Sequence, residues 1–149
     1  QPNVRAAAVT ALTQARPHSL PAVALLIPHL SQERPEVVLS AARALGRFGA
    51  AAKVAIPALI ATLTTIDPSA DDTTLPRTLR RIGPASIPPL AKLLQSDNPR
   101  LLRMSAICLE RFGPRAAAVL PALETHREHA DPAASAAVQS AIAKIGPSP

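Results

Sequence analysis

The sequence predicts an all-α protein built from about four and a half repeated helix pairs. Two series of residues support this prediction. Prolines recur 33, 33, 31 and 33 residues apart, at positions 2, 35, 68, 99 and 132. Glycines at positions 49, 83, 113 and 146 follow 14 or 15 residues after the last four of these prolines, and Arg16 stands at the equivalent first position. A period of about 33 residues is typical of two short helices joined by turns.

Each window from a proline to its glycine position has the pattern of one helix with defined ends. Asp67, Asn98 and Asp131 directly precede three of the prolines and can cap free backbone N–H groups, while a proline in the first turn has no donor to lose. The last three glycines are each followed by proline, which predicts a left-handed cap and a stop. We call these windows the second helices and expect them at about residues 3–15, 36–48, 74–82, 99–112 and 132–145.

Apolar segments between these windows predict a further set of helices. The last three of the four contain an aligned Ile or Leu followed by proline and, two residues later, by leucine, and Ala24 stands in place of that proline in the first. Pro57 and Pro121 lie eight residues after a glycine, so we expect them to kink their helices about one turn in. We call these segments the first helices and expect them at about residues 20–31, 52–66, 87–96 and 116–129.

The middle second helix departs from the pattern, because its window contains Pro76 and an acidic run before it. A proline in mid-helix costs about 3 kcal/mol. We therefore expect this helix to begin near Thr74 as N-cap, with residues 67–73 forming an acidic loop. A cation site in this loop is the alternative, although the ligand spacing and terminal Glu of a calcium loop are missing.

One apolar stripe runs through every second helix, at one, four, five and eight residues before the glycine position. Helix pairs of this length, with Pro-x-Leu in the first helix, Asp/Asn-Pro opening the second and Ile/Phe-Gly-Pro closing it, resemble HEAT repeats, particularly the short bacterial kind also called phycobilisome-lyase-like. The resemblance covers residues 2–147. It implies an all-α fold, a right-handed α-solenoid of HEAT-type helix pairs in a single domain over residues 1–149, whose second helices line the concave side. The family often places Arg after Val near the start of the second helix, and only Val4-Arg5 follows that pattern here.

The two ends of the sequence are both second helices, and the first residue is not Met. Solenoid ends normally carry polar capping repeats, because each repeat buries its apolar surface only against its neighbours. Val4 and Leu12 at one end, and Val138 and Ile142 at the other, offer no charged cap. We expect a segment of a longer chain, or ends that stack on further repeats or on another molecule.

The composition excludes several classes of protein. A single Cys among 149 residues excludes an internal disulfide framework and multi-cysteine metal sites. No apolar run reaches the roughly 18 residues of a membrane span. We therefore expect a soluble protein, for which a cytoplasmic location is favoured.

Positive charge is concentrated on the second helices. Their windows contain eleven basic and four acidic residues, whereas the rest of the chain contains five basic and six acidic ones, within a net charge of +6. Arg43 and Arg47 stand four residues apart, as do Arg77 and Arg81, so each pair shares one helix face. We expect a ladder of cations across the second helices, formed by Arg43, Arg47, Arg77, Arg80, Arg81, Arg100, Arg103, Arg111 and Lys144.

This ladder predicts a non-enzymatic scaffold that binds a protein or peptide of acidic character. A planar guanidinium can donate two hydrogen bonds at once to a carboxylate or a phosphate. Binding of a nucleic-acid backbone is the alternative, although both phenylalanines fall in the core stripe and leave no ring to stack on bases. An assembly factor or lyase-like subunit follows from family analogy alone. A merely solvated arginine surface is the remaining interpretation.

No catalytic residue, cofactor or metal site is predicted. His126 and His129 are three residues apart and could face one metal ion, but the sequence shows no third ligand. Cys108 falls in the apolar stripe, so we expect a buried, unreactive thiol. The five glycines lie at helix ends and at Gly46, which leaves no glycine-rich phosphate loop.

Overall fold

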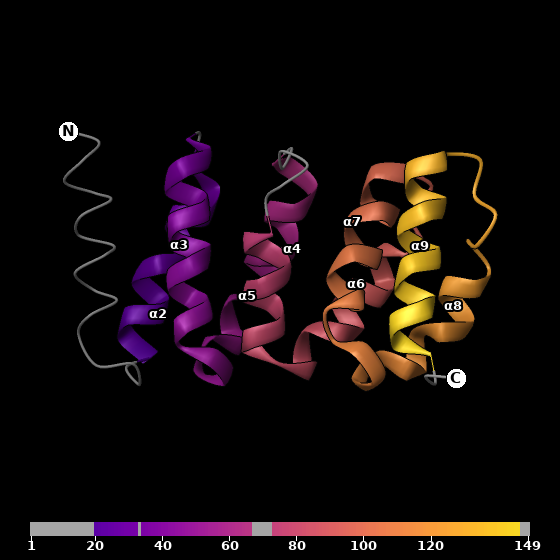
Figure 1. Cartoon of the computed structure of the whole chain (residues 1–149). Coiled ribbons are helices and arrows are strands. Elements are labelled where there is room, and N and C mark those ends of the chain that lie inside the picture. The colour runs from indigo at the N-terminus through magenta and orange to yellow at the C-terminus, as the bar shows by residue number, and fades with distance from the viewer. Residues whose placement is uncertain (1–19, 33, 67–72, 147–149) are drawn as a thin grey trace. The chain divides into compact units, whose positions relative to one another are not determined.

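Short helices joined by tight turns make up the regular secondary structure in the computed structural model, which describes residues 20–32, 34–66 and 73–146 (Figure 1). No strand occurs among these described residues. The chain divides into two compact units, residues 1–83 and 84–149. The second helix expected at residues 3–15 lies outside the described residues.

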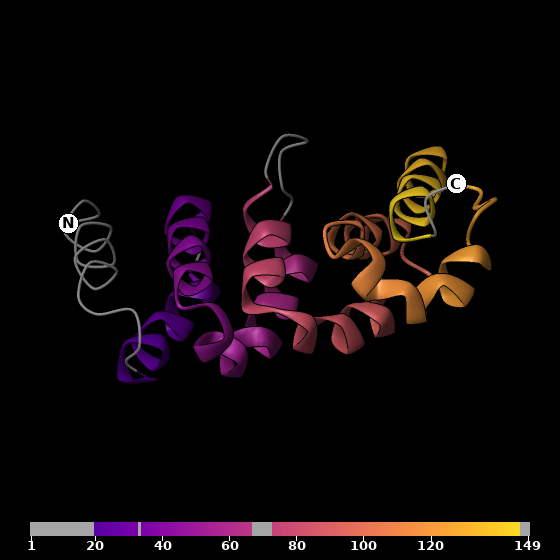
Figure 2. The same cartoon turned by 60° about the horizontal axis from the view of Figure 1, so that its bottom comes forward.

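Each unit contains two helix pairs in its described part. Unit 1 consists of α2 (Leu20–Leu26) with the 3-10 helix η1 (Ile27–Ser31), α3 (Pro35–Arg47), the 3-10 helix η2 (Gly49–Ala55) with α4 (Ile56–Thr65), and α5 (Thr74–Ile82). Unit 2 consists of the 3-10 helix η3 (Pro84–Ser86) with α6 (Ile87–Leu93), α7 (Pro99–Glu110), the 3-10 helix η4 (Gly113–Val119) with α8 (Leu120–Glu124), and α9 (Pro132–Ile145). Within each unit the second helices pack side by side, α3 with α5 and α7 with α9, and the first helices form the other layer (Figure 2). This all-α arrangement of repeated helix pairs is the α-solenoid class that the sequence predicts.

The predicted apolar stripe forms the core of both units. Residues one position before the glycines are all buried, with at most 6% exposure: Phe48, Ile82, Phe112 and Ile145. Four positions before the glycines, Leu45, Leu79 and Leu109 are fully buried, whereas Ile142 of α9 is half-buried. Burying such stripes between layers contributes about 25 cal/mol per Å² of apolar surface, which is the main stabilisation of a helix-pair repeat.

The helix ends follow the predicted chemistry in part. Asn98 Oδ1 accepts a 3.0 Å hydrogen bond from Arg100 N at the start of α7, and Asp131 Oδ1 accepts one of 2.7 Å from Ala134 N at the start of α9. Gly113 has the left-handed φ of +56° that its cap requires. The left-handed cap expected at Gly146 is wrong, because that residue has φ −61° and ψ 165°. The following proline disfavours helical ψ at Gly146 and so favours the extended conformation, although Gly113 keeps its left-handed φ before a proline as well.

The start of α5 also corrects one expectation. Thr74 is the first helical residue rather than the N-cap, and Thr73 occupies the N-cap without a capping side-chain hydrogen bond. Pro76 is therefore the third residue of α5. There its missing N–H removes no intrahelical bond, because the first-turn donors have no acceptor within the helix.

The prolines of the first helices lie in the first turn of an α-helix, rather than one turn inside it as expected from the sequence. Pro57 and Pro121 are the second residues of α4 and α8, and the segment before each is a 3-10 helix. The α-helix begins next to the proline because the first turn tolerates a residue without N–H. The expected first helix at residues 116–129 is α-helical only over Leu120–Glu124 and continues in turns through residue 128.

Candidate functional site

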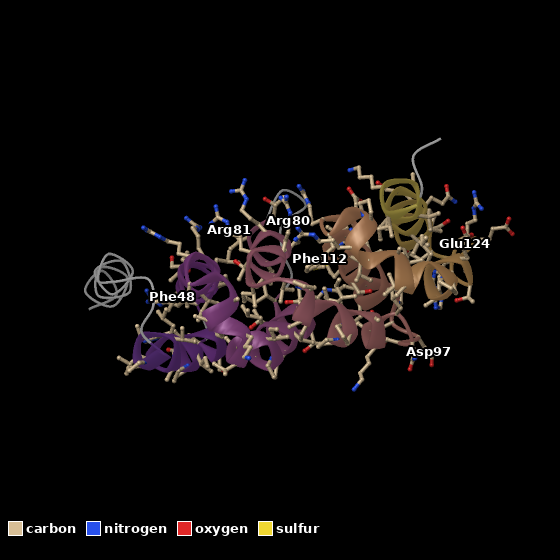
Figure 3. The ribbon with its side chains drawn as sticks, turned by 90° about the horizontal axis from the view of Figure 1, so that it is seen from below. Phe48, Arg80, Arg81, Asp97, Phe112 and Glu124 are labelled. Atoms are coloured by element: carbon tan, nitrogen blue, oxygen red, sulfur yellow. The ribbon has the colours of Figure 1, made fainter. Side chains whose placement is uncertain are left out.

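Five exposed arginines in the described part of unit 1 extend from its second helices α3 and α5, and the exposed Arg34 directly precedes α3. The five side chains face solvent at Arg43, Arg47, Arg77, Arg80 and Arg81. In Figure 3 the labelled Arg80 and Arg81 lie on the side of α5 away from the first helices, whereas Phe48 lies between the helix layers. Five of the nine predicted partner-binding residues thus extend into solvent from one helix layer.

The helices α3 and α5 approach closely at Gly46 and Thr78. Thr78 Oγ1 donates a buried 2.9 Å hydrogen bond to the Ala42 carbonyl. A Cβ atom at Gly46 would lie 3.2 Å from Thr78 Oγ1 and 3.3 Å from Thr78 Cα, so a side chain there would force the helices to shift. Thr78 therefore sits between Ala42 and Gly46, which are one helical turn apart, and is level with Ala44 of α3.

This register places four arginines at two heights along the helix axes, and we call each height a level. Arg77 is level with Arg43 and Arg81 with Arg47, and the second level lies about 6 Å further along the helices. The Cδ atom of Arg81 is 3.6 Å from the Cβ position of Gly46, so the Arg81 side chain leans over α3. We call Arg43 with Arg77 arginine pair 1, Arg47 with Arg81 arginine pair 2, and the four residues together the arginine face.

Arg80 lies outside these pairs. It is turned by about 100° from Arg81 around the axis of α5, because an α-helix has 3.6 residues per turn. Its position corresponds to Gly46 in the preceding repeat, and Gly46 lies on the side of α3 that faces α5. By the same repeat geometry Arg80 lies on the side of α5 turned away from α3.

Few acidic residues accompany the arginine face among the residues of unit 1 that the structure describes. The described part of unit 1 contains seven Arg and Lys residues and one acidic residue, Glu36. Glu36 lies in the first turn of α3, seven residues before Arg43 and so about two turns away. Among the described residues, none of the four arginines forms an ion pair. The arginine face is therefore a field of exposed guanidinium groups with no carboxylate partner in the described part of the chain.

The predicted cations of unit 2 have different surroundings. Lys144 Nζ of α9 forms an ion pair with Glu110 Oε1 of α7. Arg100 and Arg103 on α7 are half-buried, and Arg111 is exposed. The four predicted residues of unit 2 thus include one cation that already has a carboxylate partner and two whose side chains are partly covered.

One repeat position explains the contrast between Arg81 and Lys144. Both residues stand two positions before a helix-ending glycine. Each of these cations lies beside the preceding second helix, at the residue three positions before the glycine that ends that helix. This residue is Gly46 next to Arg81, and Glu110 next to Lys144. A carboxylate therefore neutralises Lys144 in unit 2, whereas the glycine at the same repeat position in unit 1 offers no charge to Arg81, which forms no ion pair with any described residue.

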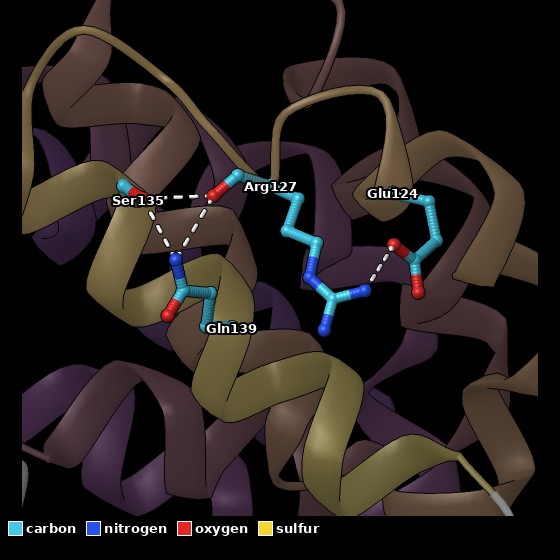
Figure 4. A network of polar contacts seen from close by, with 4 residues as sticks. All are labelled: Glu124, Arg127, Ser135 and Gln139. Carbon is cyan, nitrogen blue, oxygen red and sulfur yellow. Dashed lines mark hydrogen bonds and ion pairs between the residues drawn. The ribbon is translucent and has the colours of Figure 1, made fainter.

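The turn between α8 and α9 is held by a separate polar network (Figure 4). The carbonyl of Arg127 accepts hydrogen bonds from Ser135 Oγ at 2.8 Å and from Gln139 Nε2 at 3.1 Å. The guanidinium of Arg127 lies 3.3 Å from Glu124 Oε2. These contacts bind the turn to α9, and they leave Arg127 ion-paired.

The candidate catalytic groups have structural roles in the described residues. Burial raises the pKa of the Cys108 thiol to about 12, against a smaller lowering effect of Arg111, so the thiol is protonated at neutral pH. His126 and His129 have ring centroids 6.3 Å apart, and His129 Nδ1 accepts a 3.0 Å hydrogen bond from Asp131 N. No group of three or more His, Cys, Asp or Glu side chains suited to a metal ion occurs in the part of the chain that the structure describes.

One groove of about 260 Å³ lies between η1 and α4 in unit 1. Its hydroxyl groups Thr62 Oγ1 and Thr65 Oγ1 donate to carbonyls of α4, at 2.8 Å to Ala58 and 3.3 Å to Thr62 respectively. The described residues that line the groove include Ser31 and Gln32 as well as these threonines, and none of them is a His, Cys or charged residue. None of the described helices is long and apolar enough to cross a membrane.

Two contacts of the site are not predicted by the sequence analysis. The close approach of Gly46 to Thr78 joins residues 32 positions apart, and the Glu110–Lys144 ion pair joins residues 34 positions apart. Both separations are close to the repeat period of about 33 residues. With neighbouring repeats aligned by their glycines, the Glu110–Lys144 pair is visible as an acidic residue three positions before one glycine and a basic residue two positions before the next.

Comparisons with known proteins found one family model and several solved structures that are similar to this chain. The family model of HEAT repeats matches residues 1–74. An engineered protein of known crystal structure is 20% identical, with a TM-score of 0.44 over 94% of this chain and 72% of its own. A second engineered protein is 21% identical, with a TM-score of 0.47 over 97% of this chain and 44% of its own. No curated protein matches the sequence.

Proposed function

We propose that the protein is a non-enzymatic scaffold that binds an acidic segment of a partner protein on the arginine face of α3 and α5. One observation carries this proposal: Arg43, Arg47, Arg77 and Arg81 are exposed on two adjacent helices without an ion-pair partner among the described residues. The match of residues 1–74 to HEAT repeats supports a role in protein interaction. The spacing of 31 to 33 residues between the helix-opening prolines supports the finer proposal that the repeats are of the short, phycobilisome-lyase-like kind.

The chemistry of the face favours carboxylates. Each guanidinium presents a planar fork of donors that can hold both oxygens of one carboxylate. Glu36, the single acidic residue in the described part of unit 1, lies about two turns away and does not compete for these donors. An incoming acidic segment therefore finds donors that no described side chain occupies.

The surface of the described residues offers little to nucleobases. Phe48 and Phe112, the two aromatic residues apart from histidine, are each 6% exposed, so neither ring can stack on a base. A nucleic acid would have to bind through its phosphates alone. That mode has a distinct dependence on salt.

Salt titration separates the two kinds of partner. We would measure the affinity of the protein for a fluorescently labelled acidic peptide and for a labelled DNA duplex between 50 and 200 mM NaCl, concentrations chosen to cover roughly the range in which counterion release dominates. Duplex binding through four phosphate contacts would give a slope of log affinity against log salt of roughly −3.6. The proposal predicts peptide binding with a clearly shallower slope, because a short peptide has no condensed counterions to release, and little binding of the duplex. Tight duplex binding with the steep slope and no peptide binding would replace the proposed function by nucleic-acid binding.

A further inference from the structure

The arginine face has a fixed geometry that restricts the pattern of acidic residues it can hold. The Thr78–Ala42 hydrogen bond sets α5 level with α3, and the Gly46–Thr78 contact brings the two helices close together. Gly49 confirms this register at the helix ends, because its Cβ position would lie 3.6 Å from the Arg81 carbonyl. The two arginine pairs are therefore held by backbone packing rather than by flexible loops.

The distance between the pairs follows from helix geometry. Arg43 and Arg47 are four residues apart on α3, as are Arg77 and Arg81 on α5, which gives about 6 Å along the helix axes. Helices packed through small residues have axes about 8 Å apart, at the short end of the usual range. Long arginine side chains can span that distance, so both guanidiniums of one pair can reach the same carboxylate from opposite sides.

An extended peptide matches this spacing. Successive side chains of a β-like segment point to opposite sides, so residues two apart point to the same side, about 6.6 Å from each other. Adjacent acidic residues would direct one carboxylate away from the protein, and acidic residues four apart would lie about 13 Å from each other in an extended chain. A helical ligand with acids four apart also matches the distance, but a short isolated helix is marginal in water and like charges at that spacing weaken it.

We infer that the arginine face binds an extended segment with two acidic side chains separated by one residue, one carboxylate held by each arginine pair. This inference rests on the proposed function and specifies its ligand. The segment runs along the exposed surface where α3 and α5 meet, parallel or antiparallel to the helices. Unit 2 cannot hold the same pattern, because Ile107 and Ser140 stand where pair 1 stands in unit 1, and Lys144 is bound to Glu110.

The test uses three isomeric peptides and the full chain. Each labelled peptide has ten residues, neutral ends and two glutamates in a Gly/Ser background, arranged as Glu-Glu, Glu-x-Glu or Glu-x-x-x-Glu. The net charge is equal in all three, so differences in affinity at low salt report the spacing alone. We expect the Glu-x-Glu peptide to bind roughly tenfold more tightly than either isomer, because only it engages both pairs.

Two variants with equal loss of charge separate geometry from general attraction. Replacing pair 1 (Arg43→Gln with Arg77→Gln) leaves only arginine pair 2 to hold a carboxylate. The Glu-x-Glu peptide should then bind about as tightly as its two isomers. Replacing the arginines of α5 instead (Arg77→Gln with Arg81→Gln) leaves two levels on α3, so the preference should persist at lower affinity. Arg80→Gln, outside the pairs, should change affinity by roughly twofold or less and leave the preference intact.

The outcomes distinguish this inference from the proposed function. Equal binding of the three isomers, lost in both double variants, overturns the spacing and leaves the acidic-segment scaffold standing. Binding of none of the peptides overturns the scaffold function together with the inference. A preference for Glu-x-Glu that is unchanged in the pair 1 variant also overturns the inference, because the two levels would then not be its cause.

Discussion

The hydroxyl of Thr78 donates a buried 2.9 Å hydrogen bond to the carbonyl of Ala42, and this contact holds α5 level with α3. A buried threonine hydroxyl without an acceptor would be unfavourable, so the bond specifies one sliding position of the two helices. The positions of Arg43, Arg47, Arg77 and Arg81 relative to one another follow from that register. The central packing contact of unit 1 is thus also what arranges its candidate binding surface.

Removing this hydrogen bond should destabilise the protein without unfolding it. We expect Thr78→Val to lower the free energy of unfolding by about 1 kcal/mol, because valine keeps the volume but loses the buried bond. Urea denaturation followed by circular dichroism measures this loss. The control is Thr65→Val, an exposed site whose hydroxyl bonds only within α4, where we expect a change within about 0.5 kcal/mol. Equal effects at the two sites would contradict the proposed role of Thr78.

Gly46 should be intolerant of a methyl group despite its helical position. An alanine in a helix interior usually gains about 1 kcal/mol over glycine. At Gly46 the added Cβ would lie 3.3 Å from the backbone Cα of Thr78, which can move only if α5 moves. We therefore predict that Gly46→Ala lowers the free energy of unfolding, measured in urea.

The same substitution in a Thr78→Ala background provides the control. Without the Thr78 hydroxyl, which would lie 3.2 Å from the new Cβ, the cost of Gly46→Ala should decrease. A stabilising Gly46→Ala in the wild-type background would show that the helices do not approach as closely as described.

The Glu110–Lys144 ion pair should contribute little to stability and should suppress anion binding in unit 2. The Glu110 side chain is 13% exposed, but the Lys144 side chain is 63% exposed, so water screens the pair as it does surface pairs, which contribute about 0 to 1 kcal/mol. We predict that Glu110→Gln lowers stability by less than about 1 kcal/mol and creates weak additional binding of acidic peptides. Nuclear magnetic resonance titration with the Glu-x-Glu peptide should then show shifts at Lys144 and Arg111 that wild type lacks. Unchanged spectra around α9 in the variant would contradict this account.

Cys108 should make stability fall at high pH. Burial raises the pKa of its thiol from an ordinary 9.0 to about 12, so the folded state binds a proton that the unfolded state releases. The contribution of the protonated, buried thiol to the free energy of unfolding is fully present below about pH 9 and is lost as pH rises from there towards 12. The difference in unfolding free energy between wild type and Cys108→Ala should therefore narrow from pH 8 to pH 11, within a window set by these two values.

Thiol labelling provides a second measurement on Cys108. A thiol reagent should react slowly with the folded protein at pH 8, roughly one unit below the ordinary thiol pKa, and rapidly in urea. A constant stability difference across the pH range, or rapid labelling of the folded chain, would show that the thiol is accessible.

The repeated helix pairs and their core could be predicted from the sequence because each residue involved acts locally. Proline and glycine define helix ends through their own backbone chemistry, and Leu45, Leu79 and Leu109 are buried because they recur at one helical offset. The capping roles of Asn98 and Asp131 were predictable for the same reason. The conformation of Gly146 and the change from 3-10 to α-helix next to Pro57 and Pro121 could not be predicted, because they depend on competition between neighbouring local preferences.

The candidate site was predictable only in its composition. The sequence places arginines four residues apart. It does not show that Thr78 packs against Gly46 between two turns of α3, and this contact places Arg77 at the same height along the helices as Arg43. It also does not show that Glu110 turns towards Lys144 rather than towards Arg111 beside it. Both facts depend on how neighbouring repeats pack, which no single repeat encodes.

Charge reversal on the arginine face tests the proposed binding surface most directly. One variant carries Glu at positions 43, 47, 77 and 81, and the matched variant carries Glu in place of Arg34, Lys53, Lys92 and Arg115, four exposed cations outside the second helices. Both lose the same net charge, so non-specific attraction falls equally. We predict that the first variant loses at least roughly a hundredfold in affinity for an acidic peptide and the second less than roughly tenfold. Equal losses in the two variants would contradict the proposed binding surface.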